Sequence, residues 1–173
     1  TVFMFSGQGA QYAGMGKDLY DNYAVAKEVF DRADEVLGYS IKDICFSDEE
    51  KLGLTEFTQP AILTMSIAAM KVMQENGINA DMTAGLSLGE YSALVASGAM
   101  KFEEAVALVQ KRGKFMAEAV PNGKGGMFAI IGLDTELVEK SCEEAVKEIG
   151  GVAVPANYNA PGQIVIGGDA ATV

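Results

Sequence analysis

Short apolar runs alternate along this chain with longer stretches in which apolar residues recur every three or four positions. Residues 2–5 form an apolar run that predicts a buried strand, and the glycine-rich segment 6–9 follows it. Amphipathic periodicity predicts a helix over residues 18–37, closed by Gly38. Residues 40–57 are predicted to form an irregular connection.

A second helix is predicted to start at Thr58, where a capping side chain precedes a proline, and to end near residue 76. Residues 80–86 fit a strand, and a turn at Ser87 then leads into helices over residues 88–97 and 101–120. Because helices alternate with buried strands, the pattern predicts a three-layer α/β domain with a mainly parallel sheet.

The last third of the chain has a more compact pattern of strand, helix, strand and strand. These elements are predicted at residues 127–131, 134–149, 152–157 and 163–167. Asp169 has the side chain to cap another helix, so the segment reads as a ferredoxin-like βαββαβ unit cut off at its second helix. We therefore expect a large α/β domain over residues 1–123 and a truncated ferredoxin-like domain over residues 124–173.

Composition narrows the classes of function. The formal net charge of −11 argues against nucleic acid or an anionic membrane as partner. Cys45 and Cys142 lie far apart, and no basic and apolar leader opens the chain, which favours the cytoplasm. Cys142 shares a predicted helical face with apolar residues and is expected in the core. Without histidine or clustered cysteines, no zinc site is expected.

The sequence Gly85-Leu86-Ser87-Leu88-Gly89 matches GxSxG, the pattern of a nucleophile elbow. A strand is predicted before it and a helix after it, which is the context an elbow requires; the alternative is a serine that merely caps the helix. In an elbow, the N–H of Leu88 and the helix dipole can stabilise an oxyanion beside the Ser87 hydroxyl. The chain contains no histidine to act as the base that such a serine needs.

Arg112, one of only two arginines, falls within the apolar stripe of the helix predicted over residues 101–120. A buried guanidinium needs an anionic partner, which is either a structural carboxylate such as Glu90 or a carboxylate on the substrate. Gln8 lies between two glycines after the first predicted strand, at the sheet edge where ligands bind in open α/β folds. Its spacing alone favours a plain turn.

Five segments together resemble the malonyl-CoA:acyl carrier protein transacylases of bacterial fatty acid synthesis and, more distantly, the acyltransferase domains of polyketide synthases. They are residues 5–11, 58–61, 85–94, 110–116 and 157–163, in the order found in that family. The resemblance implies an α/β-hydrolase-like large domain with an inserted ferredoxin-like small domain. It also implies malonyl-CoA and acyl carrier protein as partners, and no cofactor.

The resemblance implies a role for each candidate residue. Ser87 would take the malonyl group from coenzyme A as an ester and yield it to the phosphopantetheine thiol of the carrier protein. Gln8 and the N–H of Leu88 would form the oxyanion hole, and Arg112 would bind the malonyl carboxylate. A guanidinium that pairs with this carboxylate selects malonyl over acetyl.

The chain departs from the family pattern in three ways. Leu86 stands where histidine is frequent, and Ser6 stands where proline is common. The family's catalytic histidine comes from a later segment, so the resemblance covers about the first half of a family member. We expect a fragment, or one chain of a split protein that pairs with the missing C-terminal half. Alone it is predicted to be inactive, because loss of the base costs on the order of 10⁴ to 10⁶ in rate.

Two other readings stay open at this point. A serine esterase or thioesterase would use the same elbow with water as the acceptor. A catalytically silent piece that folds with a complementary chain would serve as an assembly module.

Overall fold

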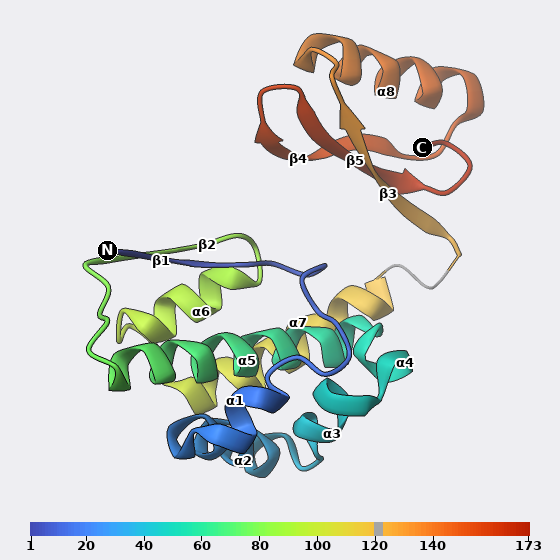
Figure 1. Ribbon diagram of the computed structural model, residues 1–173. Coiled ribbons are helices and arrows are strands. Elements are labelled where there is room, and N and C mark those ends of the chain that lie inside the picture. Colours follow the sequence, from blue (N-terminus) through green and yellow to red (C-terminus); the bar gives the residue numbers. More distant parts are fainter. Residues whose placement is uncertain (120–122) are drawn as a thin grey trace. The chain divides into compact units, whose positions relative to one another are not determined.

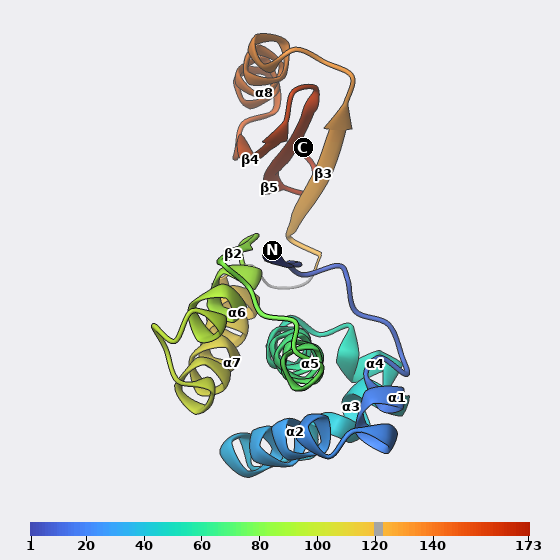
Figure 2. The same cartoon turned by 60° about the vertical axis from the view of Figure 1, so that its left-hand side comes forward.

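A long helix, α5 (Thr55–Glu75), runs through the middle of the first of two compact units. The computed structural model describes residues 1–119 and 123–173, and the units are Thr1–Ala117 and Glu118–Val173. Figure 2 looks along α5, with α6 and α7 on one side of it and α2 and α3 on others. The remaining helices of this unit are α1 (Lys17–Asn22), α2 (Ala24–Leu37), α3 (Ile41–Ser47), α4 (Glu49–Leu52), α6 (Gly89–Ala96) and α7 (Phe102–Ala119).

Two parallel strands, β1 (Val2–Phe5) and β2 (Met82–Gly85), pair with Phe5 opposite Gly85. They lie side by side over α6 (Figure 1). Since the strands are parallel, the loop after β1 and the turn after β2 leave the sheet at the same edge. The core below contains fully buried side chains from several helices, including Phe30, Leu63, Ile67 and Val106.

The predicted irregular connection over residues 40–57 was wrong. It contains α3, α4 and the start of α5. The two short helices have side-chain caps: Ser40 Oγ accepts from Asp43 N at 3.2 Å, and Asp48 Oδ1 accepts from Lys51 N at 3.0 Å. Local caps and the burial of a few apolar residues stabilise helices too short to show a periodic stripe.

Substitution of Ser40 by alanine is expected to lower the free energy of unfolding by about 1 kcal/mol, because it removes the cap of α3. Ser40→Asp retains an acceptor for the Asp43 N–H and should stay near the wild type. Urea unfolding of the three proteins checks this. An equal loss in both variants would show that the cap is not what stabilises α3.

The start of α5 also differs from the prediction. The helix begins at Thr55, and Leu54 rather than Thr58 precedes it as the cap residue. Thr58 is buried in the first turns, where its hydroxyl donates to the carbonyl of Leu52 at 2.6 Å. Pro60 therefore lies inside the helix instead of opening it. The single helix predicted over residues 18–37 is divided into α1 and α2, because Tyr23 between them has an extended backbone with φ −128° and ψ 117°. The predicted helices over residues 88–97 and 101–120 are present with shifted ends, and residue 120 lies outside the described residues.

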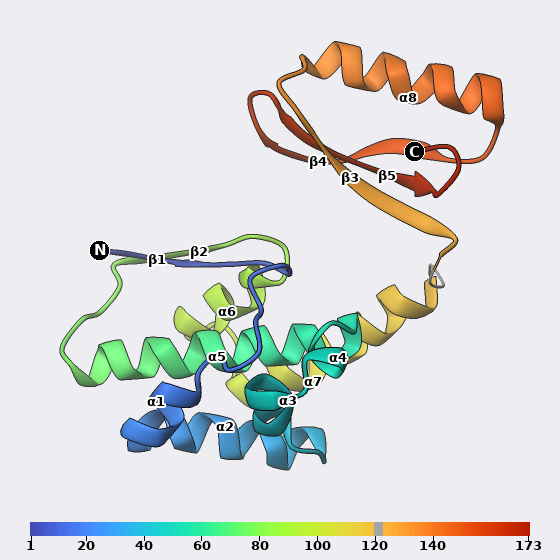
Figure 3. The ribbon, with the colours of Figure 1, turned by 45° about the vertical axis from the view of Figure 1, so that its right-hand side comes forward.

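The second unit has the predicted order of strand, helix, strand and strand. Its elements are β3 (Gly125–Ile131), α8 (Thr135–Ile149), β4 (Ala153–Ala160) and β5 (Gln163–Asp169). The strands form an antiparallel sheet in the order β3-β5-β4, and α8 covers one face of it (Figure 3). Val138 and Cys142 of α8 pack against Ile164 and Ile166 of β5 in a small core.

Asp169 does not cap a helix in this structure. It ends β5, and its carboxylate accepts from the backbone N–H of Val152 at 2.7 Å. The molecule as described is thus an α/β protein with one parallel and one antiparallel sheet.

Candidate active site

Ser87 lies in a sharp turn between β2 and α6. Its φ of 53° makes it the one non-glycine residue with positive φ within residues 1–119 and 123–173. Such a backbone conformation costs of order 1–3 kcal/mol and persists only where the surroundings enforce it. The turn is fixed on both sides, since Leu86 N donates to Phe5 O at 3.2 Å and Gly89 N donates to Leu86 O at 2.9 Å. The predicted strand, turn and helix of an elbow are therefore present.

The glycines on either side of Ser87 are required by close backbone contacts. A Cβ on Gly85 would overlap the backbone of Gly89, and a Cβ on Gly89 would overlap the carbonyl of Phe5. A Cβ on Gly7 would come within 2.8 Å of the carbonyl oxygen of Leu86. The loop after β1 and the turn of Ser87 are thus pressed together, and neither has room for a side chain at these positions.

Gly89→Ala is expected to destabilise the chain by about 1–3 kcal/mol or more, since the new methyl group forces the backbone of α6 away from Phe5. Gly53→Ala is the matched control, because Gly53 has helical φ and its Cβ would meet nothing closer than 3.4 Å. Thermal unfolding measures both. Equal stability of the two variants would contradict the close packing of the elbow.

Arg112 of α7 reaches the elbow directly. Its Nη2 donates to Ser87 Oγ at 3.0 Å, its Nη1 donates to Gln59 Oε1 at 2.8 Å, and its Cζ lies 5.7 Å from the ring centroid of Tyr91. The alternative in which a structural carboxylate such as Glu90 pairs with Arg112 is wrong. Among the described residues, no carboxylate forms an ion pair with Arg112. The guanidinium is held by neutral groups, which leaves its charge available to an anionic ligand.

The apolar stripe predicted around Arg112 is only half buried. Val109 and Ala105 are buried, whereas Leu108 and Met116 are 42% and 47% exposed. Arg112 itself is half-buried. Its side chain therefore lies at the border between core and solvent, where a ligand can approach.

Sequence reasoning assigned no role to Gln59. It is fully buried on α5, its Oε1 accepts from Arg112, and its Nε2 donates to Met116 Sδ at 3.2 Å. The available signal was a polar side chain in an otherwise apolar run of a buried helix, which requires hydrogen-bond partners.

Gln8 and Leu88 flank the elbow from two directions. The side-chain amide of Gln8 is exposed and donates to Thr55 Oγ1 at 3.2 Å, and residues 8–9 form a turn. Leu88 precedes α6 with its side chain fully buried. Its backbone N–H has no acceptor in the part of the chain that the structure describes, so it is free to bind an anion.

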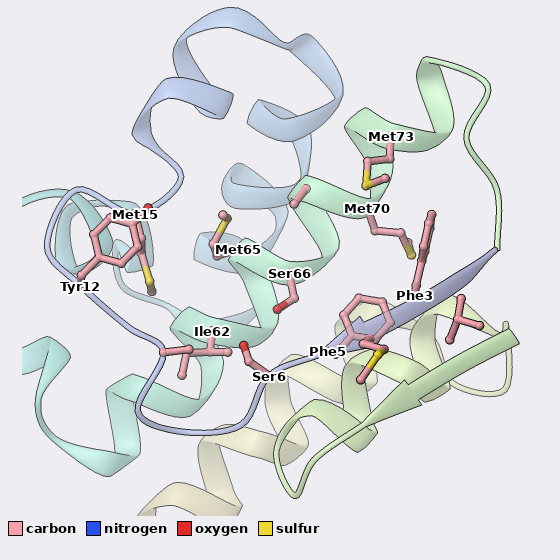
Figure 4. Close-up of a pocket in the computed structure, with 14 residues that line it drawn as sticks. Phe3, Phe5, Ser6, Tyr12, Met15, Ile62, Met65, Ser66, Met70 and Met73 are labelled. Carbon is pink, nitrogen blue, oxygen red and sulfur yellow. The ribbon is translucent and has the colours of Figure 1, made fainter.

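A separate cavity of about 410 Å³ lies between β1 and α5. Figure 4 shows its lining, with Phe3 and Phe5 on one side and Met65, Met70 and Met73 along α5 on the other. None of Gln8, Ser87, Leu88 and Arg112 lines it. The cavity is therefore separate from the elbow.

The described residues give little support for a reactive thiol, a metal site or a membrane-spanning helix. Burial raises the pKa of the Cys45 thiol to about 12 and also raises that of Cys142, which keeps both thiols protonated in the two cores. No cluster of three metal-ligating side chains occurs within residues 1–119 and 123–173. Among the helices of the described segments, none has both the length and the apolar character needed to cross a membrane.

A serine at a strained strand-to-helix turn lies beside an arginine that has no carboxylate partner among the described residues, and this arrangement defines an α/β protein with a site suited to acyl chemistry. Residues 2–173 match the acyl transferase domain family, and the chain belongs to this family.

The relatives that it matches are more specific. It is 52% identical to the malonyl CoA-acyl carrier protein transacylase of Bacillus subtilis, over 98% of this chain and 53% of that protein. Among solved structures, it is similar to MCAT from Streptococcus pneumoniae. The two have 53% sequence identity and a TM-score of 0.91, over 99% of this chain and 55% of that one. A malonyl-transacylase solved in complex with a type II polyketide synthase acyl carrier protein is 44% identical, with a TM-score of 0.92 over 99% of this chain and 55% of that one. The chain spans about half the length of these relatives.

Proposed function

We propose that this chain carries the nucleophile and the carboxylate-binding residues of a malonyl-CoA:acyl carrier protein transacylase of fatty acid synthesis, acting in the cytoplasm. Ser87 Oγ attacks the thioester carbonyl of malonyl-CoA, the C–S bond breaks, and coenzyme A leaves as its thiol. The phosphopantetheine thiol of the carrier protein then attacks the malonyl ester and releases Ser87. The reaction is an exchange of acyl groups between oxygen and sulfur, and it needs no cofactor.

The observation that carries this proposal is the position of Arg112, whose guanidinium donates to Ser87 Oγ itself at 3.0 Å. In a malonyl thioester only one methylene group separates the carboxylate from the reacting carbonyl. A guanidinium beside the nucleophile can therefore bind the carboxylate while the carbonyl lies at Ser87. Holding the reactants in this geometry lowers the entropic part of the barrier.

The N–H of Leu88 is the first candidate for the oxyanion hole, since it has no acceptor among the described residues and lies next to the nucleophile. Gln8 is the second. Its loop contacts the elbow through Gly7, but its amide is engaged with Thr55 and has to turn before it can face the oxyanion.

We propose that the base that receives the Ser87 proton lies outside residues 1–173. The chain has no histidine, and Arg112 cannot accept a proton at neutral pH. We assign the base to the half of the relatives that this chain does not span, and we propose that the chain is inactive alone.

A completed protein tests this function: residues 1–173 joined to the part of the Bacillus subtilis relative that they do not match. Malonyl-CoA without carrier protein should add one malonyl group to the intact mass, and peptide mapping should place it on Ser87. Addition of holo acyl carrier protein should move the group to the carrier. A folded protein that gains no malonyl group, in an assay where the unaltered relative does, would overturn the proposal.

The same assay separates transfer from hydrolysis. A serine esterase or thioesterase would release free malonate without forming any acyl carrier product. Carrier proteins of fatty acid and polyketide synthesis, offered in parallel, separate the two transferase readings. The second is a real competitor, because one solved relative is a malonyl-transacylase bound to a polyketide carrier protein.

The fold proposal is an α/β-hydrolase-like large domain (residues 1–123) and a ferredoxin-like small domain (residues 124–173). The strand order β3-β5-β4 supports the second part, because it corresponds to three of the four strands of a βαββαβ sheet. The fourth strand would pair with the free edge of β3.

An assembly role is the other candidate, and the uncovered face of the small parallel sheet favours it. β1 pairs only with β2 among the described residues, Met4 is 82% exposed, and the cavity of 410 Å³ opens between β1 and α5. We propose that the second half of the relatives covers this face, in the same chain or in another. A cooperative thermal transition of residues 1–173 alone would count against obligate pairing.

A further inference from the structure

Gln59 is a buried polar residue that is hydrogen-bonded to Arg112, and its orientation is determined by its two neighbours. Arg112 offers only donors, so the oxygen of the Gln59 amide faces Nη1, at 2.8 Å. The amide nitrogen then faces Met116 Sδ, a weak acceptor, at 3.2 Å. Both ends of a fully buried amide are thus used, and the side chain is held in one position.

In this position Gln59 can orient the guanidinium of Arg112 without itself binding Ser87 Oγ. One side of the guanidinium binds Gln59 through Nη1, and Nη2 reaches Ser87 Oγ at 3.0 Å. Among the described residues Gln59 forms its hydrogen bonds with Arg112 and Met116 and none with Ser87, so the hydrogen-bonded route from Gln59 to Ser87 passes through Arg112.

Gln59 is uncharged, and this determines how much of the charge of Arg112 remains available to a ligand. A carboxylate at this position would give Arg112 a stronger, charge-assisted partner of the same size. It would also neutralise the guanidinium before an anionic ligand arrives. A neutral acceptor fixes the direction of the guanidinium and leaves its charge unpaired.

We propose that Gln59 is a positioning residue that aims Arg112 at the acyl site while preserving its charge, and thereby sets the preference for acyl groups that bear a carboxylate. This inference rests on the proposed function. It assigns part of the selectivity to a residue that acts through its hydrogen bond to Arg112.

Gln59→Glu in the completed protein is the direct test. The introduced carboxylate pairs with Arg112 and competes with the malonyl carboxylate, so kcat/KM for malonyl-CoA should fall by about 10- to 100-fold, mainly through KM. Acetyl transfer needs no charge pairing and should change by less than about threefold. The ratio of malonyl to acetyl transfer is therefore expected to drop by about 3- to 100-fold.

Gln59→Met provides a second variant with similar length and no acceptor. This variant loses the hydrogen bond that orients the Arg112 guanidinium but does not neutralise the guanidinium charge. The ratio of malonyl to acetyl transfer should therefore fall less than in Gln59→Glu. Thr64→Val is the matched control, because Thr64 is fully buried on the same helix and its hydroxyl has no hydrogen-bond partner among the described residues. The control should keep the wild-type ratio, and thermal unfolding shows which variants are folded.

The outcomes separate the two proposals. If the wild-type completed protein transfers malonyl but neither Gln59 variant changes the ratio relative to Thr64→Val, the positioning role is wrong and the function stands. Equal losses for malonyl and acetyl in both variants would reduce Gln59 to a structural residue. Absence of malonyl transfer in the folded wild type would overturn the function and this inference with it.

Discussion

Ser87→Ala will abolish acyl transfer in the completed protein, with a loss on the order of 10⁴ to 10⁶ in kcat. Without the hydroxyl there is no atom to form the malonyl ester, so the intact mass will show no malonyl group. The fold should be retained, because the hydroxyl makes only one hydrogen bond among the described residues, from Arg112, at an exposed site. Intact-mass spectrometry and carrier-protein acylation measure the two effects.

Ser92→Ala is the matched control for this experiment. Ser92 lies in α6 one turn beyond the elbow, is fully buried, and its hydroxyl has no recorded partner. Its removal should leave both ester formation and transfer near the wild type. Ester formation that persists in Ser87→Ala would move the nucleophile to another residue, and equal losses in both variants would point to damage to α6.

The parts of this fold that can be predicted from the sequence are those with a clear hydrophobic periodicity or with glycines that mark a turn. The long amphipathic helices and the βαββ unit each bury a face, and the face repeats along the sequence. The elbow was also accessible, because glycines two residues on either side of Ser87 indicate crowding, and the structure shows that crowding at Gly85 and Gly89. The short helices α3 and α4 were missed because fewer than eight residues hold too few repeats, and their caps resemble ordinary loop residues.

The partner of Arg112 illustrates what a single sequence does not contain. The anomaly of a lone arginine among apolar residues could be found from its spacing, and it did locate the site. Its partner Gln59 lies 53 positions away on another helix. Helical periodicity identifies which residues share a face of one helix, but not which residues of two helices meet. Glu90 was given as an example of a structural carboxylate, beside the alternative of a substrate carboxylate, and in the structure Arg112 of α7 contacts Gln59 of α5 instead.

Substitution of Arg112 has the second largest expected effect on acyl transfer, and we expect this effect mainly with malonyl-CoA as the substrate. In the completed protein, Arg112→Ala should lower kcat/KM for malonyl-CoA by about 100- to 1,000-fold, because the carboxylate loses a charge-assisted, bidentate partner in a partly buried site. Acetyl-CoA has no carboxylate, and its transfer should fall by less than about tenfold, through the lost contact with Ser87 Oγ. Parallel assays with the two thioesters give the ratio.

Arg112→Lys distinguishes charge from geometry. Lysine keeps the positive charge but lacks the planar fork, so it cannot hold Gln59, Ser87 and a carboxylate in the present arrangement. Malonyl transfer should therefore lie between the wild type and Arg112→Ala. Full activity of the lysine variant would mean that charge alone selects the substrate and that the alignment by Gln59 is unnecessary. Equal losses of malonyl and acetyl transfer in Arg112→Ala would remove Arg112 from substrate recognition altogether.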